Sequence, residues 1–274
     1  MKITEYSAIK SFTEDQVLLV DGNGGTKNIR IGDAIQAMLD FMSPQNHKTI
    51  FRGKNLGSVL TSEQKAAIQA GTFEDLWLGD YWEINGIKWR IADFDYWMNT
   101  GHPTKLTSHH LVIIPDTCLY MAKMNNSDTT SGGYVGSVMY TTNLANAKTL
   151  VANTFGDSVL SHREHLSNAV TNGYPSGGAL YDSEVDIPSE VMMYGHAQLM
   201  PMSTGSVIVT NHAISKTQLS LMRVCPEFIV DINNAAWLRD VVSGSTFAIV
   251  DGAGTASFSY AGVERGVRPV FAIG

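Results

Sequence analysis

The sequence predicts an α+β fold in which a short N-terminal hairpin-plus-helix segment precedes one larger domain. The strongest local signal is Asn85-Gly86, which joins the apolar runs 81–84 and 87–91 and is typical of a two-residue β-hairpin. Helical signals occur as well, because Thr61 and Gln64 have the spacing of a capping box. Strand patterns return in the last forty residues. A length of 274 residues fits one such domain with a small appendage.

Residues 1–47 form the smaller predicted part. An apolar strand at 17–20, a turn cluster at 21–25 and a return strand at 26–31 predict a hairpin. A helix then begins near Asp33 and stops at Ser43-Pro44. Its apolar residues have the i, i+3, i+4, i+7 spacing of one stripe: Ile35, Met38, Leu39 and Met42. Because such a segment buries little surface alone, we expect it to mediate attachment or oligomerisation. Packing against its own domain is the alternative.

The larger predicted part covers residues 48–274 and is expected to be one ligand-binding domain. Its expected helices, besides the one that follows Thr61, lie at residues 142–155, 161–170 and 190–194. Its expected strands, besides the hairpin, lie at residues 111–114, 237–242, 247–250 and 266–273.

Composition excludes several classes of function. Charged residues are 16% of the chain, against roughly 25% in an average domain, and the net charge is −7. No run of Lys and Arg occurs, so we expect no nucleic-acid partner. The aliphatic runs are too short to cross a bilayer, so we expect no membrane insertion. The start of the chain has no apolar signal segment, and the two cysteines are expected to be buried free thiols.

No motif with a known chemical mechanism is present. His162 and His165 lack the spacing of a zincin helix, and His109 and His110 would point to opposite faces of a strand. There is no Gly-x-Ser-x-Gly elbow, and residues 252–254 lack the third glycine of a dinucleotide loop. We therefore expect no catalytic residue, no metal ion and no cofactor, and we expect that the protein is not an enzyme.

The segment 243–262 is unusual because fourteen of its twenty residues are Gly, Ala, Ser or Thr. It is bracketed by specific sequence, Trp237-Leu238-Arg239-Asp240 before it and residues 266–271 after it. This bracketing predicts a hairpin and its loops held on a rigid frame, where binding sites often lie. An ordinary hairpin of small residues is the alternative.

The C-terminal strands resemble those of C-type-lectin-fold variable proteins, the targets of diversity-generating retroelements. The resemblance lies in Trp-Leu-Arg at 237–239, Phe-Ala-x-Val at 247–250 and Gly-Val-Arg-Pro-Val-Phe at 266–271. The hairpin over residues 79–90 fits the same pattern, and the formylglycine-generating-enzyme branch of the fold is also similar. Residues 17–27 resemble the start of phage and prophage tail proteins of gut Firmicutes.

The resemblance implies a C-type-lectin-like fold and a variable region at about 237–268. In that family an error-prone reverse transcriptase substitutes template adenines, so that Asn codons become codons for small, polar or aromatic residues. The implied fixed framework is Trp237, Arg239, Gly266, Arg268 and Pro269. The implied ligand-binding positions, taken to point outward, are Ser245, Thr246, Ile249, Asp251, Ala253, Thr255, Ser257, Phe258, Ser259, Tyr260 and Val263. Phe258 and Tyr260 would be the aromatic anchors.

The same resemblance implies a receptor-binding protein of a phage or prophage tail. Its partners would be a host cell-surface protein or glycan, other phage tail proteins, and further copies of the chain in a homotrimer. It would be made in the bacterial cytoplasm and carried in the virion tail. The calcium-binding triplets of sugar-binding lectins are missing, and Cys118 and Cys225 do not match the catalytic pair of the formylglycine enzymes. A structural tail or baseplate protein without a variable role, and an enzyme of the formylglycine-generating type, are the alternatives.

Overall fold

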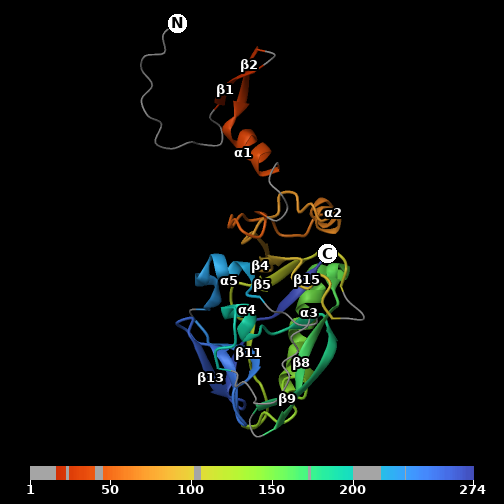
Figure 1. Ribbon diagram of the computed structural model, residues 1–274, viewed down its shortest axis with the longest axis vertical. Coiled ribbons are helices and arrows are strands. Elements are labelled where there is room, and N and C mark those ends of the chain that lie inside the picture. Colours follow the sequence, from red (N-terminus) through yellow and green to blue (C-terminus); the bar gives the residue numbers. More distant parts are fainter. Residues whose placement is uncertain are drawn as a thin grey trace. The chain divides into compact units, whose positions relative to one another are not determined.

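A computed structural model describes residues 17–22, 25–40, 46–101, 106–171, 174–199, 217–231 and 233–274 (Figure 1). The chain divides into two compact units, Met1–Asn46 and His47–Gly274, one residue before the predicted boundary. His47 belongs to the larger unit because its ring stacks on Trp77, with centroids 4.1 Å apart. Its Nδ1 also lies 2.6 Å from the carbonyl oxygen of Leu76.

The smaller unit has the predicted hairpin and helix. Strand β1 (Val17–Gly22) pairs antiparallel with β2 (Gly25–Arg30), and α1 (Ile31–Asp40) follows directly, two residues earlier than expected. Of the predicted stripe, Ile35 is 50% exposed. The side chains of Met38 and Leu39, and the whole of Met42, lie outside the described residues.

One of the two large sheets of the other unit has six antiparallel strands in the order β10-β15-β5-β4-β3, with β7 also paired to β15. The predicted Asn85-Gly86 hairpin is confirmed, because both turn residues have positive φ, 53° and 76°. The strands are β3 (Tyr81–Ile84), β4 (Ile87–Phe94), β5 (Leu111–Pro115), β7 (Val159–Leu160), β10 (Val185–Asp186) and β15 (Val270–Ile273).

The other large sheet has five strands in the order β13-β12-β11-β14-β6. Strands β11 and β14 are parallel, and the other pairs are antiparallel. The strands are β6 (Tyr120–Lys123), β11 (Ala236–Val241), β12 (Thr246–Val250), β13 (Ala256–Tyr260) and β14 (Glu264–Val267).

The expected single strand at 266–273 is therefore wrong. Its two halves, β14 and β15, belong to different sheets, and the chain crosses between them at Arg268 and Pro269. Proline has no N–H to donate to a ladder, which favours a break at this point. The buried Arg268 side chain instead donates to the backbone carbonyls of Pro115, Phe228 and Ile229, at 2.7–3.1 Å.

A second correction concerns residues 161–170, which were expected to be helical. They lie in β8 (His162–Thr171), which forms a separate antiparallel hairpin with β9 (Tyr174–Ser183). His162, Glu164 and Leu166 are buried, whereas Arg163 and His165 between them are partly exposed. This alternation has the period of two that belongs to a strand.

Short helices cover the sheets. The capping box of α2 is confirmed in both directions: the Thr61 hydroxyl accepts from the Gln64 N–H at 3.2 Å, and the Gln64 side chain accepts from the Thr61 N–H at 3.0 Å. The helices are α2 (Ser62–Ala70), the π-turn η2 (Met139–Asn143), α3 (Leu144–Phe155), the 3₁₀ turn η3 (Gly156–Ser158), α4 (Glu190–Tyr194), α5 (Ser220–Val224) and the 3₁₀ turn η4 (Pro226–Ile229). Among the described residues, no helix is long and apolar enough to cross a membrane.

Aromatic residues dominate the core of the larger unit. All five tryptophans are fully buried. Phe155 at the end of α3 contacts Trp89 and Phe271 of the six-stranded sheet, with centroids 5.7 Å and 5.4 Å apart. These contacts fix α3 on that sheet through large apolar surfaces.

Candidate functional site

Among the residues whose side chains the structure describes, the β12–β13 hairpin carries the most exposed aromatic side chains of the larger unit. Strand β13 is an edge strand, and Figure 1 shows it at the outer side of its sheet, away from β8 and β9. Phe258 and Tyr260 are 55% and 54% exposed. Because they are two residues apart on one strand, both side chains point to the same face. Ser259 between them is buried and points to the opposite face.

One end of the hairpin is a turn organised by Asp251. Its Oδ1 accepts the backbone N–H groups of Ala253 and Thr255, each at 2.9 Å. Gly254 has a φ of 81°, which glycine adopts without strain. The Tyr194 hydroxyl of α4 donates to the Gly254 carbonyl at 3.2 Å, so the turn is also bound to the rest of the unit.

The other end of the hairpin is held by residues 124–130. The Thr130 hydroxyl donates to the Ser243 carbonyl at 2.7 Å, and Asp128 accepts the Gly262 N–H at 2.9 Å. The Asn125 N–H donates to the Ala261 carbonyl at 2.8 Å. Both ends of the hairpin are therefore fixed, and the exposed side chains stand on an ordered frame.

The structure separates the predicted ligand-binding positions into two groups. Eight are exposed or partly exposed, on β13 and at the two ends of the hairpin: Ser245, Asp251, Ala253, Thr255, Ser257, Phe258, Tyr260 and Val263. The five residues of β13 span roughly 15 Å at a strand rise of about 3.3 Å per residue. The exposed positions thus form one strip along the edge of the sheet.

The expectation that Thr246, Ile249 and Ser259 point outward is wrong. Thr246 and Ile249 lie on β12, which pairs with a neighbouring strand along each edge. The residues of β12 are buried on both faces of the sheet. Ile249 is opposite Trp237 of β11. The Ser259 hydroxyl accepts from Nε of Arg265 at 3.1 Å, on the buried side of β13. Of the two strands of this hairpin, β13 alone presents one face to solvent.

The residues expected to form the fixed framework are all buried. The Trp237 ring N–H donates to the Ala122 carbonyl of β6 at 2.8 Å. Gly266 packs so closely that a Cβ there would lie 2.2 Å from Sγ of Cys118. The flanking strands are thus buried, whereas the hairpin beside them has exposed positions. A rigid frame that carries an adaptable surface requires this arrangement.

The two cysteines are free, as expected, but only Cys225 is buried, whereas Cys118 is partly exposed. Neither has the environment of a reactive thiol. Burial, with a smaller contribution from Asp231, raises the pKa of Cys118 to about 12. Burial also raises the pKa of the Cys225 thiol. Since the thiolate is the reactive form, both groups are poor nucleophiles near neutral pH.

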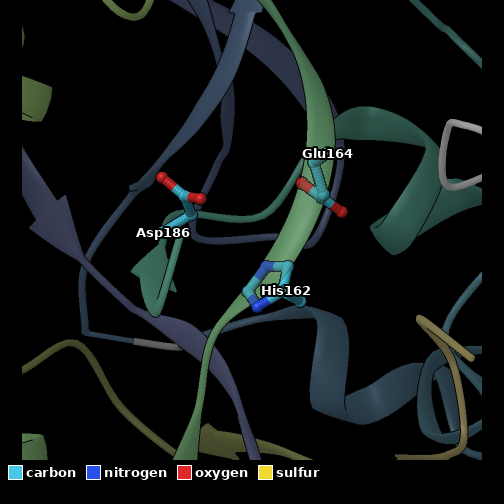
Figure 2. A group of neighbouring side chains, drawn as sticks. All are labelled: His162, Glu164 and Asp186. Atoms are coloured by element: carbon cyan, nitrogen blue, oxygen red, sulfur yellow. The ribbon is translucent and has the colours of Figure 1, made fainter. Parts of the chain in front are cut away.

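A second candidate group of side chains lies beneath the surface and was not predicted from the sequence. Figure 2 shows His162 and Glu164 of β8 together with Asp186 of β10. One ligand atom from each residue lies within 4.8 Å of the others, and all three residues are buried. The His162 ring stacks on Trp97, with centroids 3.8 Å apart.

Hydrogen bonds leave Asp186 and His162 of this group only partly satisfied. Glu164 accepts from the Trp97 ring N–H at 2.5 Å and forms an ion pair with Arg239 of β11. Asp186 Oδ1 accepts from the Tyr134 hydroxyl at 2.9 Å. Asp186 Oδ2 and both ring nitrogens of His162 have no hydrogen-bond partner of standard geometry among the described residues. Each such buried group costs about 1–3 kcal/mol when it stays unpaired.

Burial and the neighbouring charges shift the pKa values of residues in and around this group. Burial lowers the pKa of His162, which favours the neutral imidazole, although Glu164 and Asp186 oppose this shift. The pKa of Arg239 is raised, because the attraction of Glu164 and Asp186 exceeds the effect of burial. On the next residue, burial and the charge of Glu190 raise the pKa of Asp240 to about 6.

A signal for this group was present in the sequence. His162 and Glu164 are two residues apart, which places both on one face of a strand. The helical interpretation of 161–170 placed them on different faces. Asp186 and Arg239, in contrast, are distant in sequence, and only the fold brings them to β8.

No known protein family, no curated protein and no solved structure is similar to the chain at a significant level. The α+β class is shown by the mixture of sheets and short helices.

Proposed function

We propose that the protein is a non-enzymatic receptor-binding protein that recognises its ligand through the β13 edge of the five-stranded sheet. The proposed context is the tail of a phage or prophage, and the proposed ligand is a host cell-surface protein or glycan. The proposed fold family is the C-type-lectin-like fold of retroelement variable proteins, on the sequence resemblance of β11, β12 and residues 266–271. The proposed variation would be confined to the exposed positions of residues 243–263.

The observation that carries the proposal is the pair Phe258 and Tyr260. Large aromatic side chains are enriched at protein interfaces and dominate binding energy there. Here they stand on a hairpin whose two ends are hydrogen-bonded to the rest of the unit. A fixed hairpin lowers the entropy cost of binding. The raised thiol pKa values of both cysteines favour this proposal over the enzyme alternative.

The binding role is tested with two alanine variants, Phe258→Ala and Tyr260→Ala, on a panel of gut Firmicutes cells. For a cell type that binds the unchanged protein, we expect each variant to weaken binding about tenfold or more, as for aromatic anchors. Flow cytometry with labelled protein measures this. Binding should persist in a calcium chelator.

Met121→Ala and Val59→Ala are the matched controls, because both residues are exposed apolar side chains away from β13. They should bind as the unchanged protein does. Equal weakening by all four variants would contradict a specific site on β13, and full binding by Phe258→Ala and Tyr260→Ala would refute it.

The proposed diversification is tested on the DNA that flanks the gene. We expect a reverse-transcriptase gene and a near-copy of the codons for the C-terminal region, with differences at adenines. A near-copy whose differences fall on the buried codons 246, 249 and 259 would contradict the proposed division between frame and surface.

We also propose that residues 1–46 drive assembly into a trimer. Ile35 is half exposed on a helix of ten residues, which is too short to be stable alone in water. Three copies would point three binding surfaces the same way, so that avidity raises weak single-site affinity. Light scattering should give the mass of a trimer for the full chain and of a monomer for a chain that begins at His47. A monomeric full chain would refute the proposal, and an unchanged oligomer after shortening would place the interface in the larger unit.

A further inference from the structure

We propose that His162, Glu164 and Asp186 bind one divalent first-row transition-metal ion in the interior of the larger unit. The three side chains supply one imidazole and two carboxylates, and one ligand atom from each lies within 4.8 Å of the others. Imidazole and carboxylate together are ligands for Zn²⁺ and Mn²⁺, whereas Ca²⁺ selects oxygen ligands alone. The site is distinct from the β13 surface and does not depend on the receptor-binding role.

Unused lone pairs are the first argument for an ion. Asp186 Oδ2 and both ring nitrogens of His162 have no hydrogen-bond partner of standard geometry among the described residues. Buried polar atoms are nearly always satisfied in folded proteins, by protein, water or an ion. A cation accepts electron pairs from the imidazole and from both carboxylates at once, which the Trp97 and Tyr134 donors do not.

Charge is the second argument. Glu164 and Asp186 bring two negative charges into the interior, and Arg239 brings one positive charge. With a neutral His162 the group therefore carries an excess of negative charge. Buried charges require compensation, and a divalent ion supplies it where a water molecule does not.

The position of the group explains what the ion would do. His162 and Glu164 come from the β8–β9 hairpin, Asp186 from an edge strand of the six-stranded sheet, and Arg239 from the five-stranded sheet. The group therefore brings residues of three sheets into contact, and Figure 2 shows its three candidate ligands. Trp97 and Tyr134 orient Glu164 and Asp186 from outside, as hydrogen-bonded partners of metal ligands usually do. Because all three ligands are buried, the ion is structural and joins the hairpin to β10.

The test uses the full chain, stripped of metal with EDTA and returned to metal-free buffer. Equilibrium dialysis against Zn²⁺ or Mn²⁺, followed by mass spectrometry of the metal, should give one ion per chain. At a free ion concentration of about 100 times Kd, the melting temperature should rise by roughly 5–10 °C. No bound ion and no rise with either metal would overturn the proposal.

Asp186→Asn removes one ligand charge and keeps an oxygen that can accept from Tyr134. We expect it to lose the bound ion and the rise in melting temperature. Asp157→Asn changes an exposed aspartate in the same unit; it is the matched control and should keep both. Equal binding by Asp186→Asn and the unchanged protein would place the ion elsewhere. A higher melting temperature of Asp186→Asn, with no ion on the unchanged protein, would show that a proton neutralises the group and would overturn the proposal.

X-ray absorption at the zinc edge of the unchanged protein keeps the proposal testable if Asp186→Asn does not fold. We expect one imidazole and otherwise oxygen ligands. A sulfur ligand, or two or more imidazoles, would overturn the assignment.

Discussion

Replacing Trp237 by alanine should lower the free energy of unfolding by about 3–5 kcal/mol, the range for truncating a large buried side chain. Trp237 is fully buried on β11, in the middle of the five-stranded sheet. The change leaves a cavity and removes the donor for the Ala122 carbonyl of β6. A urea melt followed by circular dichroism measures the loss. Trp237→Phe separates the two causes, because it keeps most of the volume and removes only the donor.

Two substitutions at solvent-accessible residues of the same region serve as controls. Thr255→Asn and Ser257→Tyr should each change the free energy of unfolding by less than about 0.5 kcal/mol. Thr255 is exposed and Ser257 is partly exposed. Losses as large as that of Trp237→Ala would show that the hairpin belongs to the core, and the division into frame and surface would fail.

Gly266→Val should cost about 3 kcal/mol, at the upper end of the range for overpacking a filled core. The requirement for glycine is one of space. A Cβ at this position would lie 2.2 Å from Sγ and 2.8 Å from Cβ of Cys118, and 3.2 Å from the Ala235 carbonyl oxygen. The backbone cannot easily yield, because the Gly266 N–H donates to that same carbonyl at 2.8 Å. The melting temperature and a urea melt measure the loss.

Cys118→Ala provides the matched test of this explanation. Cys118→Ala removes the sulfur atom with which the valine side chain at position 266 would clash. The loss of unfolding free energy in the double variant should therefore be smaller than the sum of the losses in the two single variants. Residues in contact show coupling of about 0.5–3 kcal/mol. Additive losses in the double variant would show that Gly266 is required for another reason.

Local signals in the sequence predicted local structure well. The capping box of Thr61 and Gln64 and the Asn85-Gly86 turn involve residues within four positions of each other, and the structure has both. Their hydrogen bonds join residues that are close in sequence, so the signal for each lies within a few positions of the chain. Strands β8 and β9 gave no such signal, because their pairing is a property of two segments and the glycines at 177 and 178 weaken a strand pattern.

The two candidate sites also differ in how far the sequence predicts them. The β12–β13 hairpin could be predicted from one continuous segment and the strands that flank it. The error at Thr246 and Ile249 arose because the position of β12 inside the sheet depends on β11, which the hairpin sequence does not reveal. The buried group combines His162 and Glu164, whose spacing fits one strand face, with Asp186 and Arg239, which no spacing in the sequence connects to them.

The division of the last residues between two sheets has a consequence for how the protein is made. Strand β15 lies in the interior of one sheet, between β10 and β5, and β14 lies in the interior of the other, between β11 and β6. Neither sheet can close before residues 264–273 have left the ribosome. Until then β5, whose five residues are all buried in the folded protein, has no partner for one of its edges. Unpaired apolar strands aggregate readily, so we expect the chain to be prone to aggregation until residues 264–273 are available for pairing.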